Sequence, residues 1–348
     1  MNIDVSRLKE VLALLGLAIS KDATARPITK MLELSTKDNY LYGFTTDAYN
    51  SIKVKICATT EDINVLVSFA TFNDVIKNCE NTITLKATDK FLSIKTDVLS
   101  CKIPVHPLKN KNTVKIPDMP DTLDDIDFSE LKSYMSYCKT ILDTNFTVQA
   151  YRHIYFDDNI MVSDTDNVAI IRKNIFNKPI ILRPSSTEIL SKLDKCKYAT
   201  TKIDNTALDM EVYMLHIKTD DIEICIMPYS TNEFQYDDLM ELFDINIKNN
   251  VIIDRAVLAK AVTMSQLFNY DPILVFDSDG VSLQINQVDF KYSISSDSCE
   301  PHSYKVTVDL LKKILSNSGD ITLYFDDNDF IKCISDSGEQ ILSAEAIK

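Results

Sequence analysis

A repeat of helical and strand segments is the feature of this sequence that most constrains its fold. Six segments have the period of an amphipathic helix, and alternating strands with polar turns follow each of them. These helical patterns begin in three pairs, near Val5 and Ser68, near Phe128 and Ser186, and near Asp254 and Val308. The first members of successive pairs are about 123 and 126 residues apart. This spacing predicts three similar domains with two helices each. Their predicted bounds are 1–118, 119–243 and 244–348.

The predicted helices have one apolar face and polar residues at their starts. In the first helix the apolar side chains recur at helical spacing, at Leu8, Val11, Leu12, Leu15 and Ile19. Later helices begin at residues that can accept hydrogen bonds from free backbone amides, and the predicted caps are Asp127, Ser185, Asp254 and Thr307. Glu130 and Glu188 stand three residues after the first two caps, as in a capping box. Each helix is therefore predicted to pack one side against a sheet.

Between the helices the hydrophobic pattern has period two, which is typical of antiparallel strands joined by short turns. Turns are predicted at Asp38-Asn39, at residues 157–159 and at Asp279-Gly280. Each half-domain is then one helix on a meander of strands, so the predicted fold class is α+β. Segments 104–125 and 230–250 are rich in charge and are predicted to be linkers between domains.

The composition limits the partners and the location of the protein. The chain has 37 Lys and Arg against 51 Asp and Glu, a formal net charge of -14, so DNA binding requires positive charge gathered on one surface. The eight cysteines are scattered without a CxxC pair, as expected of free thiols in a reducing cytoplasm. No apolar stretch approaches the roughly 20 residues of a membrane span, so we expect a soluble protein with no membrane partner.

We find no residue pattern that carries catalysis, and we expect neither an enzyme nor a cofactor or metal. The four histidines lie far apart, and the five glycines form no phosphate-binding loop. Asp164 and Asp166 leave one alternative open, a metal-dependent nuclease. The preferred interpretation is that these aspartates bond their own backbone at a hairpin turn.

Several segments resemble DNA polymerase sliding clamps of the bacterial and phage type. They are ARPITKMLEL followed by LYGFTTD, then IMVSDTDNVAII, NEFQYDD and VTVDLLKKILSNSGDITLYF. The resemblance extends over the whole chain and agrees with its threefold repeat. It implies a processivity factor whose two protomers close head to tail, domain one against domain three, into a ring around duplex DNA. It also implies two protein partners, a DNA polymerase and a clamp loader.

In this family helices line the hole of the ring, and the predicted helices carry the positive charge that this requires. The windows 5–21, 68–79, 128–143, 186–197, 254–269 and 308–318 hold 13 basic and 8 acidic residues, against 24 and 43 elsewhere. We therefore expect sequence-independent contacts with phosphates. By the resemblance Arg26 and Lys77 contact DNA. By placement on predicted helices the further candidates are Lys192, Lys195, Lys197, Lys312 and Lys313.

The resemblance also implies an apolar pocket between domains two and three that binds a short linear peptide of partner proteins. Its predicted wall consists of Val168, Ala169, Ile170, Phe234, Met240, Ile341 and Leu342. Gln235 stands where many clamps have a proline, and the tail LSAEAIK lacks their usual methionine-proline ending. The sequence therefore leaves the peptide preference open.

A second interpretation of the same fold is an acidic interaction scaffold that dimerises without encircling DNA. It differs from a clamp in that it stimulates no polymerase. The sequence does not identify the cognate polymerase and loader, the stability of the dimer, or whether the source is cellular or a phage.

Overall fold

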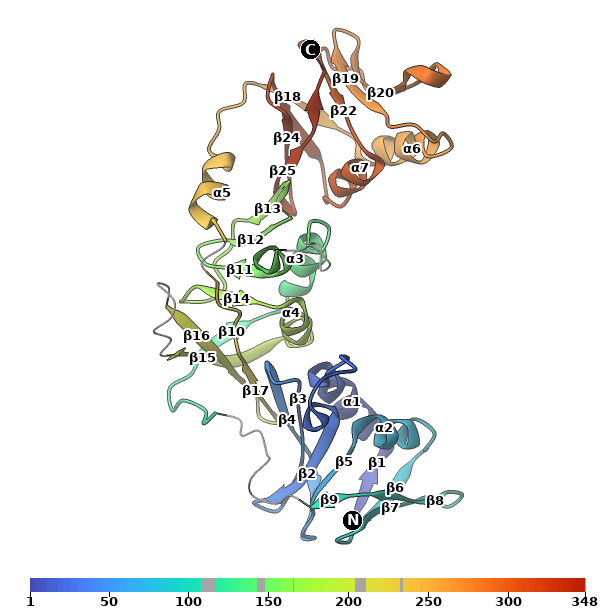
Figure 1. Cartoon of the computed structure of the whole chain (residues 1–348), viewed down its shortest axis with the longest axis vertical. Coiled ribbons are helices and arrows are strands. Elements are labelled where there is room, and N and C mark those ends of the chain that lie inside the picture. The colour runs from blue at the N-terminus through green and yellow to red at the C-terminus, as the bar shows by residue number, and fades with distance from the viewer. Residues whose placement is uncertain (108–116, 143–147, 165, 204–210, 232–233, 348) are drawn as a thin grey trace. The chain divides into compact units, whose positions relative to one another are not determined.

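The computed structural model describes residues 1–107, 117–142, 148–164, 166–203, 211–231 and 234–347. These residues belong to two compact units, and Figure 1 labels most of their elements. The first unit lies within Met1–Ser129, Ser185–Asn205 and Glu211–Pro228, and the second lies within Glu130–Pro184 and Tyr229–Lys348. The bounds of the three predicted domains stay a prediction. In the predicted linker 104–125, residues 108–116 lie outside the described residues.

The described residues contain seven α-helices, and the predicted α+β class is confirmed. The helices are α1 (Val5–Leu15), α2 (Phe69–Lys77), α3 (Leu131–Cys138), α4 (Pro184–Leu190), α5 (Tyr236–Phe243), α6 (Arg255–Ser265) and α7 (Val308–Leu315). Six of them confirm the predicted helical segments. The seventh, α5, lies in the predicted linker 230–250.

Two antiparallel sheets form the first unit. The smaller sheet has the order β1 (Asn2–Asp4), β6 (Thr82–Ala87), β7 (Phe91–Lys95) and β8 (Ser100–Pro104). The larger sheet has the order β10 (Asp124–Asp127), β15 (Lys195–Ile203), β16 (Val212–Lys218), β17 (Ile222–Ile226), β4 (Asn50–Ala58), β3 (Tyr40–Thr46), β2 (Met31–Lys37), β5 (Asn64–Ser68) and β9 (His106–Pro107). Because β17 pairs with β4, segments far apart in the sequence share one sheet.

Two further antiparallel sheets form the second unit. The larger has the order β14 (Ile180–Leu182), β11 (Ile154–Phe156), β12 (Ile160–Ser163), β13 (Asn167–Ile171), β25 (Gly338–Ser343), β24 (Phe330–Ser335), β23 (Ile321–Phe325) and β18 (Asn249–Ile253). The smaller has the order β21 (Phe290–Ser295), β20 (Gly280–Ile285), β19 (Ile273–Asp277), β22 (His302–Lys305) and β26 (Glu345–Ala346). Pairing of β13 with β25 places Val168 opposite Ile341, two residues of the predicted pocket.

The helices pack their apolar faces against these sheets. In the first unit α1 contacts β3 and β4, and Leu8, Leu12 and Leu15 are buried as the predicted stripe requires. In the second unit α6 contacts α7, β20 and β21. Full burial of such a side chain contributes about 1.5–3 kcal/mol, far more than the helix propensities that these short helices supply. Packing on the sheets therefore holds the helices in place.

The predicted turns follow the residues that favour them. Asp38 and Asn39 both have positive φ, 50° and 63°, between β2 and β3, as a tight hairpin turn requires. The turn at 157–159 is also confirmed, because Phe156 pairs with Ile160. The third turn is displaced by one residue: Gly280 pairs with Asp277 and so begins β20. Gly280 has φ of 119°, and an added Cβ there would lie 2.0 Å from the Ser295 carbonyl oxygen.

Two of the four predicted caps are confirmed and two are wrong. Asp254 accepts from the backbone N–H groups of Ala256 and Val257, and Thr307 accepts from that of Leu310. Asp127 instead ends β10, and α3 begins only at Leu131, with Glu130 at its N-cap and no side-chain cap bond. Ser185 lies inside α4, which begins at Pro184, because the fixed φ of proline suits the first position of a helix.

Candidate DNA-facing and partner-binding surfaces

Arg26 lies on an exposed loop of the first unit, directly before the short 3-10 helix Pro27–Lys30. Thr29 fixes the loop, since its backbone N–H and its Oγ1 donate to the Arg26 carbonyl at 3.0 and 2.8 Å. Arg26 lines an open cavity of about 510 Å³ together with residues of both charges, among them Lys21 and Glu188. The backbone here is therefore ordered by local bonds, and the guanidinium is exposed to solvent.

Lys77 and Lys312 are exposed helix residues, and each forms only an exposed ion pair with an aspartate of its own helix. Lys77 is the last residue of α2 and lies 3.8 Å from Asp74, one turn earlier. Lys312 of α7 lies 3.3 Å from Asp309 in the same arrangement. Exposed pairs of this kind contribute about 0–1 kcal/mol, so both ammonium groups stay available to a phosphate.

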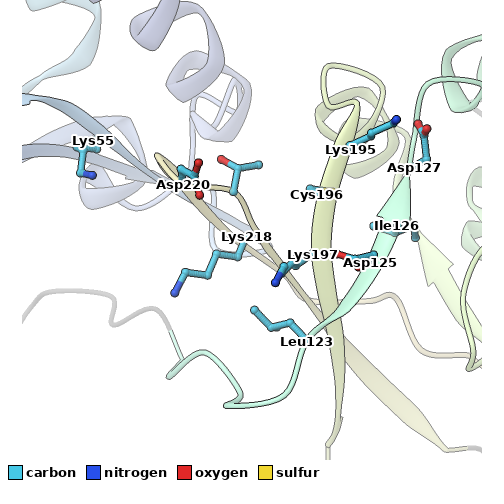
Figure 2. A pocket seen from close by; sticks show the side chains of 11 residues that line it. Lys55, Leu123, Asp125, Ile126, Asp127, Lys195, Cys196, Lys197, Lys218 and Asp220 are labelled. Atoms are coloured by element: carbon cyan, nitrogen blue, oxygen red, sulfur yellow. The ribbon is translucent and has the colours of Figure 1, made fainter.

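The helix placement of Lys192, Lys195 and Lys197 is wrong. The helix α4 ends at Leu190, Lys192 follows it, and Lys195 and Lys197 lie on β15, where they pair with Asp127 and Asp125 of β10. Exposed and buried residues alternate at the start of β15, as in a strand and not as in a helix, so that the residues next to Lys195 and Lys197 are buried. With Lys55 and Lys218 the strand lysines line an open cavity of about 1050 Å³ on the nine-stranded sheet (Figure 2). A contact between these lysines and DNA stays a prediction, without the support of a helix.

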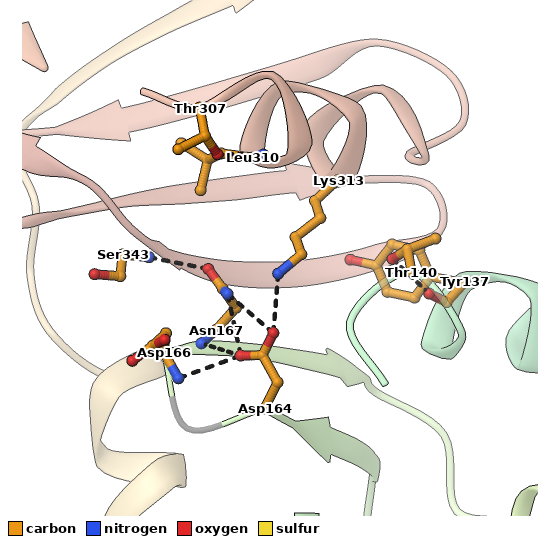
Figure 3. Close-up of polar contacts among 9 residues, drawn as sticks. All are labelled: Tyr137, Thr140, Asp164, Asp166, Asn167, Thr307, Leu310, Lys313 and Ser343. Atoms are coloured by element: carbon orange, nitrogen blue, oxygen red, sulfur yellow. Dashed lines mark hydrogen bonds and ion pairs between the residues drawn. The ribbon is translucent and has the colours of Figure 1, made fainter. Parts of the chain in front are cut away.

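Lys313 differs from its neighbour Lys312 because it has a partly buried partner. Its Nζ lies 2.9 Å from Asp164 Oδ2, and the two side chains are only 21% and 14% exposed (Figure 3). Asn167 donates from its side chain to both oxygens of Asp164, at 3.0 and 3.1 Å, and its own Oδ1 accepts from the Ser343 backbone N–H at 3.2 Å. This network joins α7, β13 and β25 within the second unit. A DNA contact by Lys313 stays a prediction, and it would compete with Asp164.

Asp164, one of the two aspartates that could have formed a nuclease site, stabilises a turn. Asp164 Oδ1 accepts from the backbone N–H groups of Asp166 and Asn167, at 3.2 and 2.7 Å. This is the backbone bonding that the sequence predicts for a hairpin turn. Among the residues that the structure describes, no three His, Cys, Asp or Glu side chains gather as metal ligands.

Within their observed bounds, the six expected helices still hold more basic than acidic residues. The six expected helices, α1, α2, α3, α4, α6 and α7, carry eight Lys or Arg and four Asp or Glu. The unexpected helix α5 has the opposite charge, with Asp237, Asp238 and Glu241 and no basic residue. The six expected helices thus carry a net positive charge in a chain whose net charge is -14, whereas α5 is acidic.

Five of the seven predicted pocket residues gather in one apolar cluster of the second unit. Val168, Ile170 and Ile341 are buried in it together with Tyr155, Met161, Ile181 and Phe243. Half-buried hydrophobic side chains pack over these residues: Tyr229, Phe234, Tyr236, Leu239, Met240, Leu242 and Phe330. This set is called the apolar cluster below. Its half-buried members leave apolar surface open to solvent, which is what a docking site for a peptide needs.

Ala169 and Leu342 lie on the other side of the same strands. Successive side chains of a strand point to opposite faces, so Ala169 faces away from Val168 and Ile170. Leu342 likewise alternates with Ile341, and both Ala169 and Leu342 are buried. These two residues therefore belong to the core on the opposite face rather than to the apolar cluster.

The sequence predicts Phe234 in the apolar cluster but not its aromatic neighbours Tyr155 and Tyr236. The ring of Phe234 stacks on that of Tyr155 with 3.4 Å between centroids and 14° between planes. Tyr236, Leu239, Met240 and Phe243 recur along α5 at helical spacing, so their periodicity could have revealed an amphipathic helix in this segment.

Two cations near the apolar cluster are bound to a single carboxylate. Glu339 Oε1 lies 2.9 Å from Arg172 Nε, and Glu339 Oε2 lies 3.3 Å from Lys332 Nζ. The hydrogen bond to Glu339 raises the pKa of Arg172. Lys332 also donates to the Phe243 carbonyl at 2.7 Å, which anchors the end of α5 to β24.

Solved structures similar to this chain are bacterial sliding clamps. The Helicobacter pylori beta clamp bound to a DNA ligase peptide has a TM-score of 0.80 and 13% identity, with 99% of each chain covered. The sliding clamp from Bartonella birtlesii bound to griselimycin has a TM-score of 0.81 and 14% identity, covering 100% of this chain and 99% of that one. The DNA polymerase III beta subunit from Thermotoga maritima has a TM-score of 0.80 and 12% identity, with the same coverage.

These similarities define the fold of the whole chain. It is the three-domain fold of the bacterial beta sliding clamps. The sequence matches no protein-family profile and no curated protein. Within the described residues, no helix is long and apolar enough to cross a membrane.

Proposed function

We propose that this protein is a DNA polymerase processivity factor, a non-catalytic sliding clamp of the cytoplasm that needs no cofactor. The observation that carries the proposal is the similarity of fold to beta clamps over 99–100% of the chain. The three domains 1–118, 119–243 and 244–348 of one protomer would form half of a ring. A second protomer, joined head to tail, would complete it around duplex DNA.

Unpaired strand edges and exposed apolar residues support the head-to-tail joint. Among the described residues, β8 ends a sheet of the first unit and β21 ends a sheet of the second, so each offers an edge for pairing with another chain. Near β8, Val98 is 97% exposed, and after α6, Leu267 is 72% exposed. The segment after α6 reaches β21, because the rings of Phe268 and Phe290 lie 5.4 Å apart. Joining these two ends would cover both edges and both apolar residues.

Positive charge on the helices supports sliding along DNA. Contacts with phosphates alone are independent of sequence and weaken steeply with salt, which lets a ring move along the duplex. Arg26, Lys77 and Lys312 are exposed candidates for these contacts. Lys192, Lys195, Lys197 and Lys313 are further candidates, with the placements described above.

The apolar cluster supports a second role, the docking of a peptide from the polymerase and from the clamp loader. A polymerase tethered to a closed ring rebinds the primer end at high effective concentration, so its processivity rises without tight contacts to DNA. Topology rather than affinity then holds the complex on the template.

Primer extension by the cognate polymerase and loader tests the proposal. The wild-type protein is expected to lengthen the products of single binding events. Arg26→Glu with Lys77→Glu is expected to shorten them again while leaving the mass of the dimer unchanged. A wild-type protein that dimerises but never lengthens the products would contradict the proposal. It would support the alternative, an acidic interaction scaffold, for which the acidic helix α5 is the favouring observation.

A further inference from the structure

A group of carboxylates borders the apolar cluster and indicates which partner this surface fits. Asp157 and Asp158 lie in the turn between β11 and β12, and Asp237, Asp238 and Glu241 lie on α5. Asp157 is half-buried and the other four are exposed. These five residues are called the acidic rim below.

The acidic rim is continuous with the apolar cluster. Asn159, in the same turn as Asp157, donates from its side chain to the Tyr236 hydroxyl at 3.3 Å and lies 4.0 Å from the Met240 sulfur. Tyr236 and Met240 are half-buried members of the apolar cluster. A ligand that covers these two side chains therefore also meets the carboxylates of the turn and of α5.

Two cations beside the apolar cluster, Arg172 and Lys332, are already bound elsewhere. Arg172 and Lys332 both pair with Glu339, as described above. Within the described residues, no Lys, Arg or His nitrogen lies within 4.0 Å of a rim carboxylate. Among the described side chains, that of Asn174 donates one weak hydrogen bond to the rim, to Asp158 at 3.5 Å. Five negative charges thus face solvent beside an apolar surface.

The raised pKa of Asp157 is consistent with a rim that has no cation close to its carboxylates. Burial raises the pKa of the Asp157 carboxyl, and the nearby charges of Asp158 and Asp237 raise it further. Like charges close together disfavour ionisation, and an opposite charge placed among them reverses this effect. A positively charged ligand would therefore be stabilised here, whereas an acidic one would be repelled.

We propose that the partner of the apolar cluster is a linear peptide whose apolar anchor residues are flanked by lysine or arginine. The proposal rests on the peptide-docking role given above and adds the charge of the peptide. The anchors would cover Phe234, Tyr236 and Met240, and the flanking cations would pair with the acidic rim. Surface ion pairs are individually weak, so two or three of them are expected to strengthen binding about 10-fold at low salt, and less at high salt.

The test compares labelled peptides that share the same anchors, one phenylalanine and two leucines, and differ only in three flanking residues: lysine, glutamine or glutamate. A fourth peptide keeps the three lysines and lacks the anchors. Binding to the full chain is measured by fluorescence anisotropy at 50 and 300 mM NaCl, with EDTA present so that metal ions do not occupy the rim. The expected order of affinity is lysine, glutamine, glutamate, with no saturable binding of the fourth peptide.

Paired variants separate the rim from the overall charge of the protein. Asp157→Asn with Asp237→Asn is expected to remove most of the advantage of the lysine peptide. The control, Asp220→Asn with Asp320→Asn, changes the net charge equally at two exposed sites outside the rim and is expected to keep that advantage. Asp157→Lys with Asp237→Lys is expected to reverse the order, so that the glutamate peptide binds more tightly.

The outcomes distinguish the two proposals. Equal binding of the three anchored peptides, or equal loss of affinity in the rim and control variants, would overturn the basic-peptide proposal while leaving a peptide site in place. Failure of all anchored peptides to bind at any salt concentration would instead overturn the docking role itself.

Discussion

Replacing Lys313 by methionine is expected to destabilise the second unit, although the adjacent Lys312 tolerates the same change. Lys313 pairs with Asp164 at 2.9 Å, where the two side chains are 21% and 14% exposed. Breaking a fully buried pair costs about 3–5 kcal/mol, and an exposed pair contributes about 0–1 kcal/mol. Since this pair lies between the two cases and leaves the hydrogen-bonded Asp164 without its cation, we expect a loss of about 2 kcal/mol.

Urea unfolding followed by circular dichroism and tyrosine fluorescence measures this loss, because the chain has 15 tyrosines and no tryptophan. Lys312→Met is the matched control, since Lys312 is 57% exposed on the same helix and its partner Asp309 is 85% exposed. It should lower the free energy of unfolding by less than about 0.5 kcal/mol. The double variant, Lys313→Met with Asp164→Asn, should lose less stability than the two single variants lose in sum, because both changes remove the same interaction. Equal losses for Lys312→Met and Lys313→Met would refute this reasoning.

Three further predictions concern stability. Ala48 has φ of 81°, so Ala48→Gly is expected to raise the free energy of unfolding by about 0.5 kcal/mol, measured by urea unfolding, and a decrease would show that the turn is unstrained. Gly280→Ala is expected to cost at least about 2 kcal/mol because of its positive φ and the Ser295 carbonyl, and unchanged stability would contradict this. Burial lowers the pKa of His153 from 6.5 to about 4, so the unfolded chain binds a proton below pH 6.5 that the native chain does not. Full stability above pH 6.5 should therefore fall by about 2–3 kcal/mol towards pH 4, and His153→Phe should lessen that fall; identical pH profiles would refute the assignment.

The repeat made the fold predictable, because helices such as α1 and α6 bury one face on the strands that follow them in the sequence. The period of the helices and the turn residues Asp38 and Asn39 depend on local chemistry, and both agree with the structure. Predictions from local sequence were wrong where pairing between distant segments determines the secondary structure. Asp127 has the sequence of a helix cap, but it is bound in a ladder between β10 and β15.

The candidate surfaces were predicted less completely, since they depend on contacts between distant segments. Lysine spacing near α4 fits a helix and a strand equally well, and burial of alternate residues decided for β15. The pairing of Lys313 with Asp164 spans 149 residues and has no local signature. Helix α5 did carry a readable apolar period, but its acidic residues gave the segment the composition of a linker.

The solution mass of the purified protein, measured by light scattering and combined with negative-stain imaging, tests the central claim most directly. The account predicts particles of about twice the chain mass of 39.5 kDa that enclose a central hole. Compact particles with the mass of a single chain at every concentration would contradict the proposed ring and, with it, the topological mechanism.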